Sequence, residues 1–315
     1  YCSDFKLDQT PIDGQVMDLH KFAELGQKGV LLLMSDSTNA ERPGYTLSER
    51  VVGKAFDEAF GEAEGRVLVA TFASNIHRIQ QIIDAAATYG RKIAVIGRSM
   101  VNNVGIAAKL GYLQIPAGIM VEVSELERYP SEKVVIITTG SQGEPMAALT
   151  RMAMSEHRRI DIVPGDTVII SAMPIPGNEK LVGKTINHLF RQGAKVIYQA
   201  VSGVHVSGHA SQEELKLLLN LCRPKYFMPI HGEYRMIVRH AELAEDVGIS
   251  RDRILLCDIG DVLEITPDRV NKAGKVTSGQ VLVDGLGVGD VGNIVSLPDL
   301  TSSPEASFTC GNQKN

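Results

Sequence analysis

Histidines next to glycines and serines are the residues of this chain best suited to chemistry. The segment HVSGH (205–209) follows the apolar run 196–198 across a short loop, and HGE (231–233) follows the run 225–230. Imidazole nitrogens bind metals or transfer protons, and a neighbouring glycine lets a ligand approach the backbone closely. We therefore predict a metal or phosphate site near His205, His209 and His231. The alternative is a set of hydrogen-bonded structural histidines.

Two acidic residues could join such a site. Asp36 lies in SDSTN (35–39), directly after the apolar run GVLLLM, and Asp4 lies in the opening Cys2-Ser3-Asp4. An aspartate at the end of a strand is also typical of a turn in which its carboxylate bonds the backbone, and both interpretations of Asp36 stay open. Four other histidines fall in helical or loop segments without such neighbours, and we expect them on the surface: His20, His157, His188 and His240.

The elements that position these residues follow a repeated scheme of an apolar strand, a polar turn and an amphipathic helix. VLVATF (67–72) predicts a buried strand, Ser74 a helix N-cap, and Gly90 the end of the helix that follows. Other segments repeat the scheme. Further strands are expected at 92–97, 134–139, 168–171 and 196–198. Further helices are expected at 50–60, where a capping box at 46–49 precedes the helix, and from Pro145, at 181–191 and at 215–221. This alternation predicts an α/β fold with a largely parallel sheet, whose ligand sites collect at the carboxyl ends of the strands.

Two nucleotide-binding signatures fail on their context. The glycines of GVGDVG (287–292) have the dinucleotide spacing, but no helix pattern follows to hold a pyrophosphate. Gly183-Lys184-Thr185 resembles the end of a P-loop, but Asn178 stands where that loop needs glycine, and the triplet falls inside a predicted helix. We therefore expect β-turns at the first segment and a solvated helix face at the second.

Composition describes an ordinary globular chain. It has 315 residues, 44% of them hydrophobic, and a net charge of −5, so no global positive field attracts nucleic acid and any RNA binding must be local. No apolar run is long enough to span a bilayer, so we expect no membrane partner. The four cysteines lie far apart, which favours reduced thiols and a cytoplasmic location over a disulfide framework: Cys2, Cys222, Cys257 and Cys310. From about Arg253 short strands are expected, at 254–258, 261–266 and 280–285.

Several strings in order make the chain resemble ribonuclease J, a metallo-β-lactamase-type nuclease with an inserted β-CASP domain. They are SDSTN (35–39), TFASNIHR (71–78), TGSQGEPMAAL (139–149), PIPGNE (174–179), HVSGH (205–209) and MPIHGEYR (228–235), within a match from Tyr1 to about Val295. The resemblance implies a partial αββα metallo-β-lactamase domain at 1–35, the β-CASP α/β domain with a helix-flanked parallel sheet at 36–204, and a returning lactamase segment with RNA-specificity motifs at 205–265. A linker or the start of a β-rich module is expected at 266–295, and a disordered tail at 296–315.

The resemblance also implies roles for individual residues. Asp4 and His231 match zinc ligands, Asp4 being the aspartate that bridges two zinc ions, while His209 and Asp36 match catalytic positions, His209 assisting proton transfer. Positions matching RNA phosphate contacts, including a pocket for a 5′ monophosphate, are His205, Ser207, Gly208, Ser74, Gly140 and Ser141. Hydroxyl and backbone N–H groups bind phosphate without a net positive charge, which fits the acidic composition.

The implied activity is zinc-dependent hydrolysis of RNA phosphodiesters, both 5′-to-3′ exonucleolytic and endonucleolytic, in RNA maturation and decay. The resemblance places the family's H-x-H-x-D-H metal motif before Tyr1, and this chain contains no such motif. We therefore expect a fragment, truncated at both ends, that by itself binds zinc weakly and cuts RNA poorly, and a homo-oligomer for the full-length family. Three alternatives remain: a DNA-processing β-CASP hydrolase, a non-catalytic RNA- or phosphate-binding remnant, and an α/β scaffold with structural histidines.

Overall fold

The computed structural model describes residues 1–143, 147–175, 177–198 and 203–279, and the backbone of 282–283, 287–289 and 295–296. The chain forms two compact units. Unit 1 contains Tyr1–Phe5, Asp18–Gly44 and the chain from Ala210 onward, and unit 2 contains Lys6–Met17 and Tyr45–His209. The divisions after Gly44 and His209 lie some residues beyond the boundaries at 35/36 and 204/205 that the sequence suggests.

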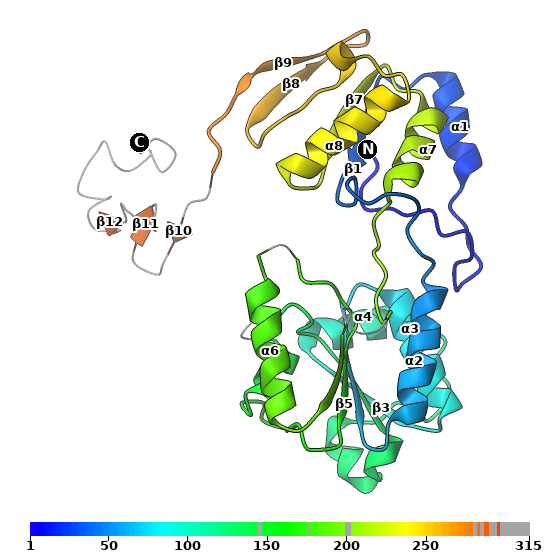
Figure 1. Ribbon diagram of the computed structural model, residues 1–315, viewed down its shortest axis with the longest axis vertical. Helices are drawn as coiled ribbons and strands as arrows, with labels where there is room; N and C mark the ends of the chain where they lie inside the picture. Colours follow the sequence, from blue (N-terminus) through cyan, green and yellow to red (C-terminus); the bar gives the residue numbers. More distant parts are fainter. Residues whose placement is uncertain are drawn as a thin grey trace. The chain divides into compact units, whose positions relative to one another are not determined.

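Unit 2, whose strands β3 and β5 are labelled in Figure 1, is built on a five-stranded parallel sheet. The strand order is β3-β4-β2-β5-β6. Its strands are β2 (Val67–Ala70), β3 (Lys92–Ile96), β4 (Val134–Thr138), β5 (Thr167–Ile170) and β6 (Lys195–Tyr198). Every residue of the three central strands is buried, as expected for parallel strands covered on both faces. This confirms the predicted α/β class and the five strand positions.

Helices cover both faces of this sheet. Alternate β2 residues divide between two cores, Val67 and Val69 packing in one and Leu68 and Ala70 in the other, because side chains alternate across a strand. The first core contains residues of α2 (Arg50–Glu62), α3 (Ile76–Thr88) and α4 (Arg98–Lys109), and the second contains residues of α5 (Ala148–Ala153) and α6 (Glu179–Arg191). Two 3₁₀ helices, Val123–Arg128 and Ser131–Lys133, precede β4.

Two predicted helix starts in unit 2 are wrong, and a third falls on residues that the structure does not describe. The N-cap of α3 is Asn75, not Ser74, because the Asn75 side chain accepts from the Arg78 N–H at 3.1 Å. The capping box expected at 46–49 does not form, since the Thr46 hydroxyl instead donates to the carbonyl of His209 at 2.7 Å. Helix α5 begins at Ala148, whereas Pro145, where a helix start was expected, lies outside the described residues.

Unit 1 contains a short parallel sheet. β1 (Leu32–Asp36) pairs in parallel with β7 (Tyr226–Ile230), and isolated parallel bridges add Cys2 beside Ser35 and Ile254 beside Phe227. The helices of this unit are α1 (Leu19–Lys28), α7 (Gln212–Cys222) and α8 (Tyr234–Asp246). A side chain at Gly26 of α1 would meet the Leu221 carbonyl at 2.1 Å, so only glycine permits the close approach of α1 and α7.

The carboxyl-terminal part is β-rich, as expected. After a 3₁₀ helix at Arg251–Arg253, β8 (Asp261–Ile265) and β9 (Val270–Lys275) form an antiparallel pair, and β10 (Leu282–Val283), β11 (Gly287–Gly289) and β12 (Val295–Ser296) form another small antiparallel sheet. The expected strand at 254–258 is only a single bridge at Ile254. Gly287–Gly289 of the rejected dinucleotide signature lie in β11, and Gly183–Thr185 lie inside α6.

The predicted tail lies outside the described residues from position 297, while Ser296 belongs to β12. In the described part of the chain, no helix combines the length and apolar character that crossing a membrane requires.

Helix α2 offers a direct test of this packing, because adjacent valines face opposite environments. Val52 is fully buried, whereas Val51 is 39% exposed. We expect Val52→Ala to lower the free energy of unfolding by about 2 kcal/mol, since two buried methyl groups are lost and a cavity remains. Val51→Ala, the matched control, should change it by less than about 0.5 kcal/mol. Urea unfolding followed by circular dichroism measures both, and equal effects would contradict the assigned faces of α2.

Candidate functional site

In unit 1, three chain segments end at the same edge of the parallel sheet. The Cys2 N–H donates to the Met34 carbonyl at 2.8 Å, and the Asp36 N–H donates to the Cys2 carbonyl at 3.2 Å, so the first residues run beside β1. β1 in turn pairs with β7, with Asp36 opposite Ile230. Because parallel strands place their carboxyl ends together, the residues that follow them meet there.

Asp4 and His231 are brought into direct contact at this edge. The Nε2 atom of His231 lies 3.1 Å from Oδ1 of Asp4, and both side chains are more than half exposed. An imidazole nitrogen and a carboxylate oxygen are ligand types that Zn²⁺ prefers, and exposure leaves them accessible to an ion. The predicted ligand pair is therefore adjacent in space, although 227 positions (231 − 4) separate the two residues in the sequence.

The backbone of His231 is held in a strained conformation. Its φ angle is +54°, in the left-handed region that non-glycine residues rarely adopt, which costs about 1–3 kcal/mol. Its carbonyl accepts from the Ser37 N–H at 3.2 Å, and the Thr38 hydroxyl, whose single hydrogen also faces Oδ1 of Asp36, lies 3.1 Å from the same oxygen. The turn after β1 thus determines the orientation of the histidine after β7, and strain of this kind is typical of functional sites.

Asp36 forms the turn that the sequence allowed. Its Oδ1 accepts from both the N–H of Thr38 at 2.9 Å and the Thr38 hydroxyl at 2.7 Å, and the residue is buried. The carboxylate therefore rigidifies the SDSTN turn, and this turn supplies the hydrogen bonds that hold His231.

His240 was expected on the surface, and this prediction is wrong. The side chain is fully buried in α8, its Nδ1 lies 3.0 Å from the Ser37 hydroxyl, and its ring packs edge-on against Phe227 with centroids 4.8 Å apart. Burial lowers the pKa of His240 to about 3, although the Asp36 carboxylate acts in the opposite direction. The signal was present in the sequence, since Ile237, Ala241 and Ala244 share its helical face. His240 thus supports the SDSTN turn from below as a neutral ring. Of the other three histidines, His20 is exposed and His157 and His188 are partly exposed.

In unit 2, the predicted phosphate contacts also follow parallel strands. The Gly140-Ser141 turn follows β4, Ser74 follows β2, and His205 lies beyond β6, so these residues collect at the carboxyl edge of one sheet. Ser74 is exposed, whereas Ser141 is buried. Neither serine hydroxyl has a hydrogen-bond partner among the residues that the structure describes.

The turn after β4 has a conformation that only glycines allow. Gly140 and Gly143 have φ angles of +103° and +72°, and a side chain at Gly143 would meet the backbone of α6 at 2.6 Å. The buried Gln142 amide ties this turn to the loop after β5, donating to the Met173 carbonyl at 2.7 Å and accepting from the Ile175 N–H at 2.6 Å. The Ser141 hydroxyl is therefore presented by a rigid loop.

The HVSGH segment is anchored at both ends within unit 2. Nδ1 of His205 lies 2.7 Å from a guanidinium nitrogen of Arg78, a fully buried residue of α3 that the sequence did not single out. Ser207 accepts from the His209 N–H at 3.2 Å, and the His209 carbonyl accepts from Thr46. Gly208 between them is exposed. His209 is the last residue of unit 2, and the chain enters unit 1 at Ala210.

Comparisons with known proteins agree with this architecture. Residues 64–189 match the family model described as "Ribonuclease J, beta-CASP domain", and residues 193–252 match "Zn-dependent metallo-hydrolase RNA specificity domain". Ribonuclease J of Synechocystis sp. is 52% identical over 288 residues, covering 91% of this chain and 45% of that protein. Ribonuclease J2 of Bacillus subtilis is 51% identical over 292 residues, covering 93% and 52%, and ribonuclease J of Thermus thermophilus is 50% identical over 291 residues, covering 92% and 51%. The chain thus spans about half the length of these relatives.

The buried His240 predicts a specific dependence of stability on pH. Its pKa falls from the ordinary value of 6.5 in the unfolded chain to about 3 in the folded one, so below pH 6.5 only the unfolded chain takes up this proton. The free energy of unfolding is therefore unaffected by His240 above pH 6.5, and it decreases as the pH falls from 6.5 toward 3, because protonation stabilises only the unfolded chain. Between pH 7 and pH 5 this loss should be about 2 kcal/mol.

We expect His240→Leu to remove that part of the pH dependence in urea unfolding at pH 7 and pH 5. His20→Leu, which replaces an exposed histidine of α1, should leave it in place. A stability loss on acidification that is identical in the wild type and His240→Leu would show that the ring of His240 is not held neutral.

Proposed function

The chain belongs to the ribonuclease J family, and from this premise we propose that it is part of a zinc-dependent ribonuclease that hydrolyses RNA phosphodiesters. The observation that carries the proposal is the contact between Asp4 and His231 at the carboxyl edge of the β1–β7 sheet. A relative's activity belongs to a chain about twice as long, so activity, substrate and partners are assigned here as proposals.

Asp4 and His231 would hold the metal. Their ligand atoms are close enough to bind one ion, both are exposed, and the His231 backbone is fixed by the SDSTN turn. Two zinc ions, when bound in the complete enzyme, would make hydroxide available at neutral pH and stabilise charge on the attacking and leaving oxygens.

The protein's own residues would orient the substrate and move protons. We assign His209 to proton transfer near the leaving oxygen, since an imidazole titrates close to neutral pH. We assign Asp36 to the rigidity of the SDSTN turn, because both of its bonds to Thr38 lie within that turn. The Thr46 bond to the His209 carbonyl would limit the movement of the histidine backbone.

The RNA phosphates, including a 5′ monophosphate, would bind to neutral donors in unit 2. These are the side chains or backbone of His205, Ser207, Gly208, Ser74, Gly140 and Ser141. Support comes from their position at the carboxyl edge of the β3-β4-β2-β5-β6 sheet and from the net charge of −5, which leaves local N–H and O–H groups as the means of recognition. We further propose both exonucleolytic 5′-to-3′ and endonucleolytic cleavage, a homo-oligomer, and a cytoplasmic location, the last supported by free Cys2, Cys222 and Cys257.

Two other functions make different predictions. A non-catalytic remnant would bind RNA without cleaving it, and a DNA-processing hydrolase would cleave DNA at least as fast as RNA of the same sequence. The match of residues 193–252 to an RNA specificity domain favours RNA as the substrate.

We expect His231→Ala and His209→Ala in the complete gene product to lower the rate of RNA cleavage by about 100-fold or more. The first variant loses a metal ligand, and the second loses proton transfer, which typically contributes 10²–10⁴-fold. The assay compares matched RNA and DNA oligonucleotides, and bound zinc is measured by atomic absorption. His20→Ala is the control on an exposed histidine. Full cleavage by both variants would show that His209 and His231 are structural residues. RNA binding without cleavage by the wild type would identify a non-catalytic RNA-binding remnant.

The 5′ phosphate pocket is tested by Ser74→Ala and Ser141→Ala. Each removes one hydroxyl donor to a charged group, so we expect the preference for 5′-monophosphate over 5′-hydroxyl RNA to fall about 10-fold in KM. Ser131→Ala, an exposed serine before β4, is the control. An unchanged preference in both pocket variants would place the 5′ end elsewhere.

A further inference from the structure

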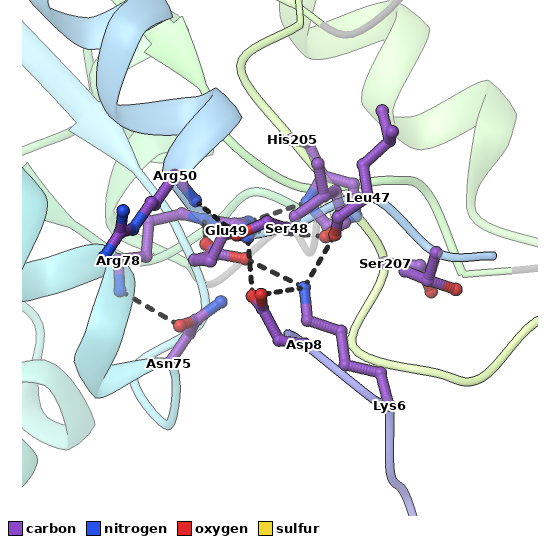
Figure 2. Close-up of polar contacts among 12 residues, drawn as sticks. Lys6, Asp8, Leu47, Ser48, Glu49, Arg50, Asn75, Arg78, His205 and Ser207 are labelled. Atoms are coloured by element: carbon purple, nitrogen blue, oxygen red, sulfur yellow. Dashed lines mark hydrogen bonds and ion pairs between the residues drawn. The ribbon is translucent and has the colours of Figure 1, made fainter. Parts of the chain in front are cut away.

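Arg78 is the largest fully buried side chain in the described part of the chain, and the proposed function assigns it no role. A buried guanidinium is costly unless a carboxylate and further acceptors satisfy its N–H groups. Glu49 supplies the carboxylate, accepting from Nε of Arg78 at 2.8 Å and from a terminal nitrogen at 2.6 Å. The Ser171 carbonyl accepts a further bond at 2.9 Å. Figure 2 shows this cluster, with Arg78 reaching from α3 toward Glu49 and His205.

The remaining N–H groups of Arg78 bind the HVSGH segment. One terminal nitrogen lies 2.7 Å from Nδ1 of His205, and the other donates to the Val206 carbonyl at 3.2 Å. Arginine has donors and no acceptor, so the direction of the bond to the imidazole is fixed: Nδ1 accepts. The ring is then neutral and carries its proton on Nε2.

Arg78 also lies in the first turn of α3, the helix that begins just after Ser74, another proposed phosphate contact. Its own N–H is capped by Asn75, which directly follows Ser74 at the start of α3. One buried cation therefore connects the turn after β2 with the segment that follows β6. The charges around it are balanced within unit 2, since Lys6 lies 3.6 Å from Glu49 and the Glu49 N–H donates to Asp8 at 2.9 Å (Figure 2).

We propose that Arg78 is a positioning residue, which holds His205 as a neutral Nε2–H donor for an RNA phosphate and fixes the HVSGH segment against the start of α3. The inference rests on the proposed function for the phosphate, but the state of the His205 ring is independent of it. A cation in direct contact with Nδ1 prevents that nitrogen from taking up a proton and so keeps the ring neutral, so His205 recognises phosphate by hydrogen bonding rather than by charge. The charged groups in this cluster are Arg78 on α3, Glu49 before α2, and Lys6 and Asp8 on the amino-terminal segment.

The test is a nuclear magnetic resonance titration of the chain labelled with ¹⁵N-histidine, with the His205 signal assigned by its loss in His205→Gln. We expect wild-type His205 to remain in the neutral Nε2–H form from pH 7.5 to pH 5.5. In the paired variant Arg78→Met/Glu49→Gln, which leaves no unpaired charge at either position, the ring should titrate near the ordinary histidine pKa of about 6.5.

Matched variants separate positioning from folding. Glu49→Gln alone keeps the bond between Arg78 and His205 and should therefore keep the His205 ring neutral. Arg78→Lys keeps a buried cation and should therefore keep the His205 ring neutral over part of the pH range. If Arg78→Met/Glu49→Gln fails to fold, these two variants and the wild-type titration decide the question. An ordinary titration of His205 in the wild type, or an unchanged neutral ring in the folded paired variant, would overturn the proposal.

A second titration uses inorganic phosphate and a 5′-monophosphorylated dinucleotide at pH 7. We expect about 10-fold weaker binding by the paired variant than by the wild type, with the far-ultraviolet circular dichroism unchanged. A wild-type chain that binds neither probe while His205 stays neutral would reject the phosphate site of the proposed function and leave the positioning of His205 by Arg78 intact. Equal binding by both proteins would overturn the role of Arg78 in recognition.

Discussion

Parallel strand pairing is the constraint from which the arrangement of the site follows. Strands that run in one direction place all their carboxyl ends at one edge, so the polar side chains of the turns that follow them collect there. In unit 1 the edge gathers Asp4, Asp36 and His231 from segments far apart in the sequence. In unit 2 the same geometry gathers the turns after β2 and β4 and the segment beyond β6. Each of the two sheets thus brings together a group of side chains that could bind a metal or a phosphate.

A turn alone does not fix the orientation of its side chains. In both units, a buried polar side chain makes hydrogen bonds to the turn and restricts its conformation. In unit 1, Ser37 is held from below by the neutral ring of His240, and the same turn holds the His231 carbonyl. In unit 2, the Arg78–Glu49 pair performs this task with charge rather than with a neutral group. A buried hydrogen bond of this kind resists displacement, because breaking it leaves a donor or acceptor without its partner in a medium of low dielectric constant. Both supports therefore favour one geometry of the turn above them.

The sequence predicted the strands well and the long-range polar contacts poorly, for a physical reason. A buried parallel strand is a continuous apolar run, so β2 and β4 could be located from their residues alone. β9 was not predicted, because VNKAGK is exposed and polar along most of its length.

The Thr46 hydroxyl could have capped α2, but it binds a carbonyl 163 positions away, and local patterns contain no information on such a partner. Arg78 escaped notice for the same reason, since arginine on a helix is ordinarily exposed and its partner Glu49 belongs to another element. Asp4 and His231, which only the family resemblance paired, lie 3.1 Å apart, because a resemblance carries tertiary information that periodicity does not.

The three histidines show that the environment, rather than the residue type, decides what an imidazole can do here. His231 is exposed on a strained backbone beside a carboxylate, which suits a ring that binds a cation. His240 is enclosed by apolar neighbours, and burial lowers its pKa so far that it can serve only as a neutral support. His205 lies between these cases. The Arg78 guanidinium donates to Nδ1 of its ring, so the ring proton lies on Nε2. Under the proposed function, a chain with a net charge of −5 would recognise a polyanion by this means, because a neutral donor held in place by a compensated buried cation attracts phosphate without raising the net charge.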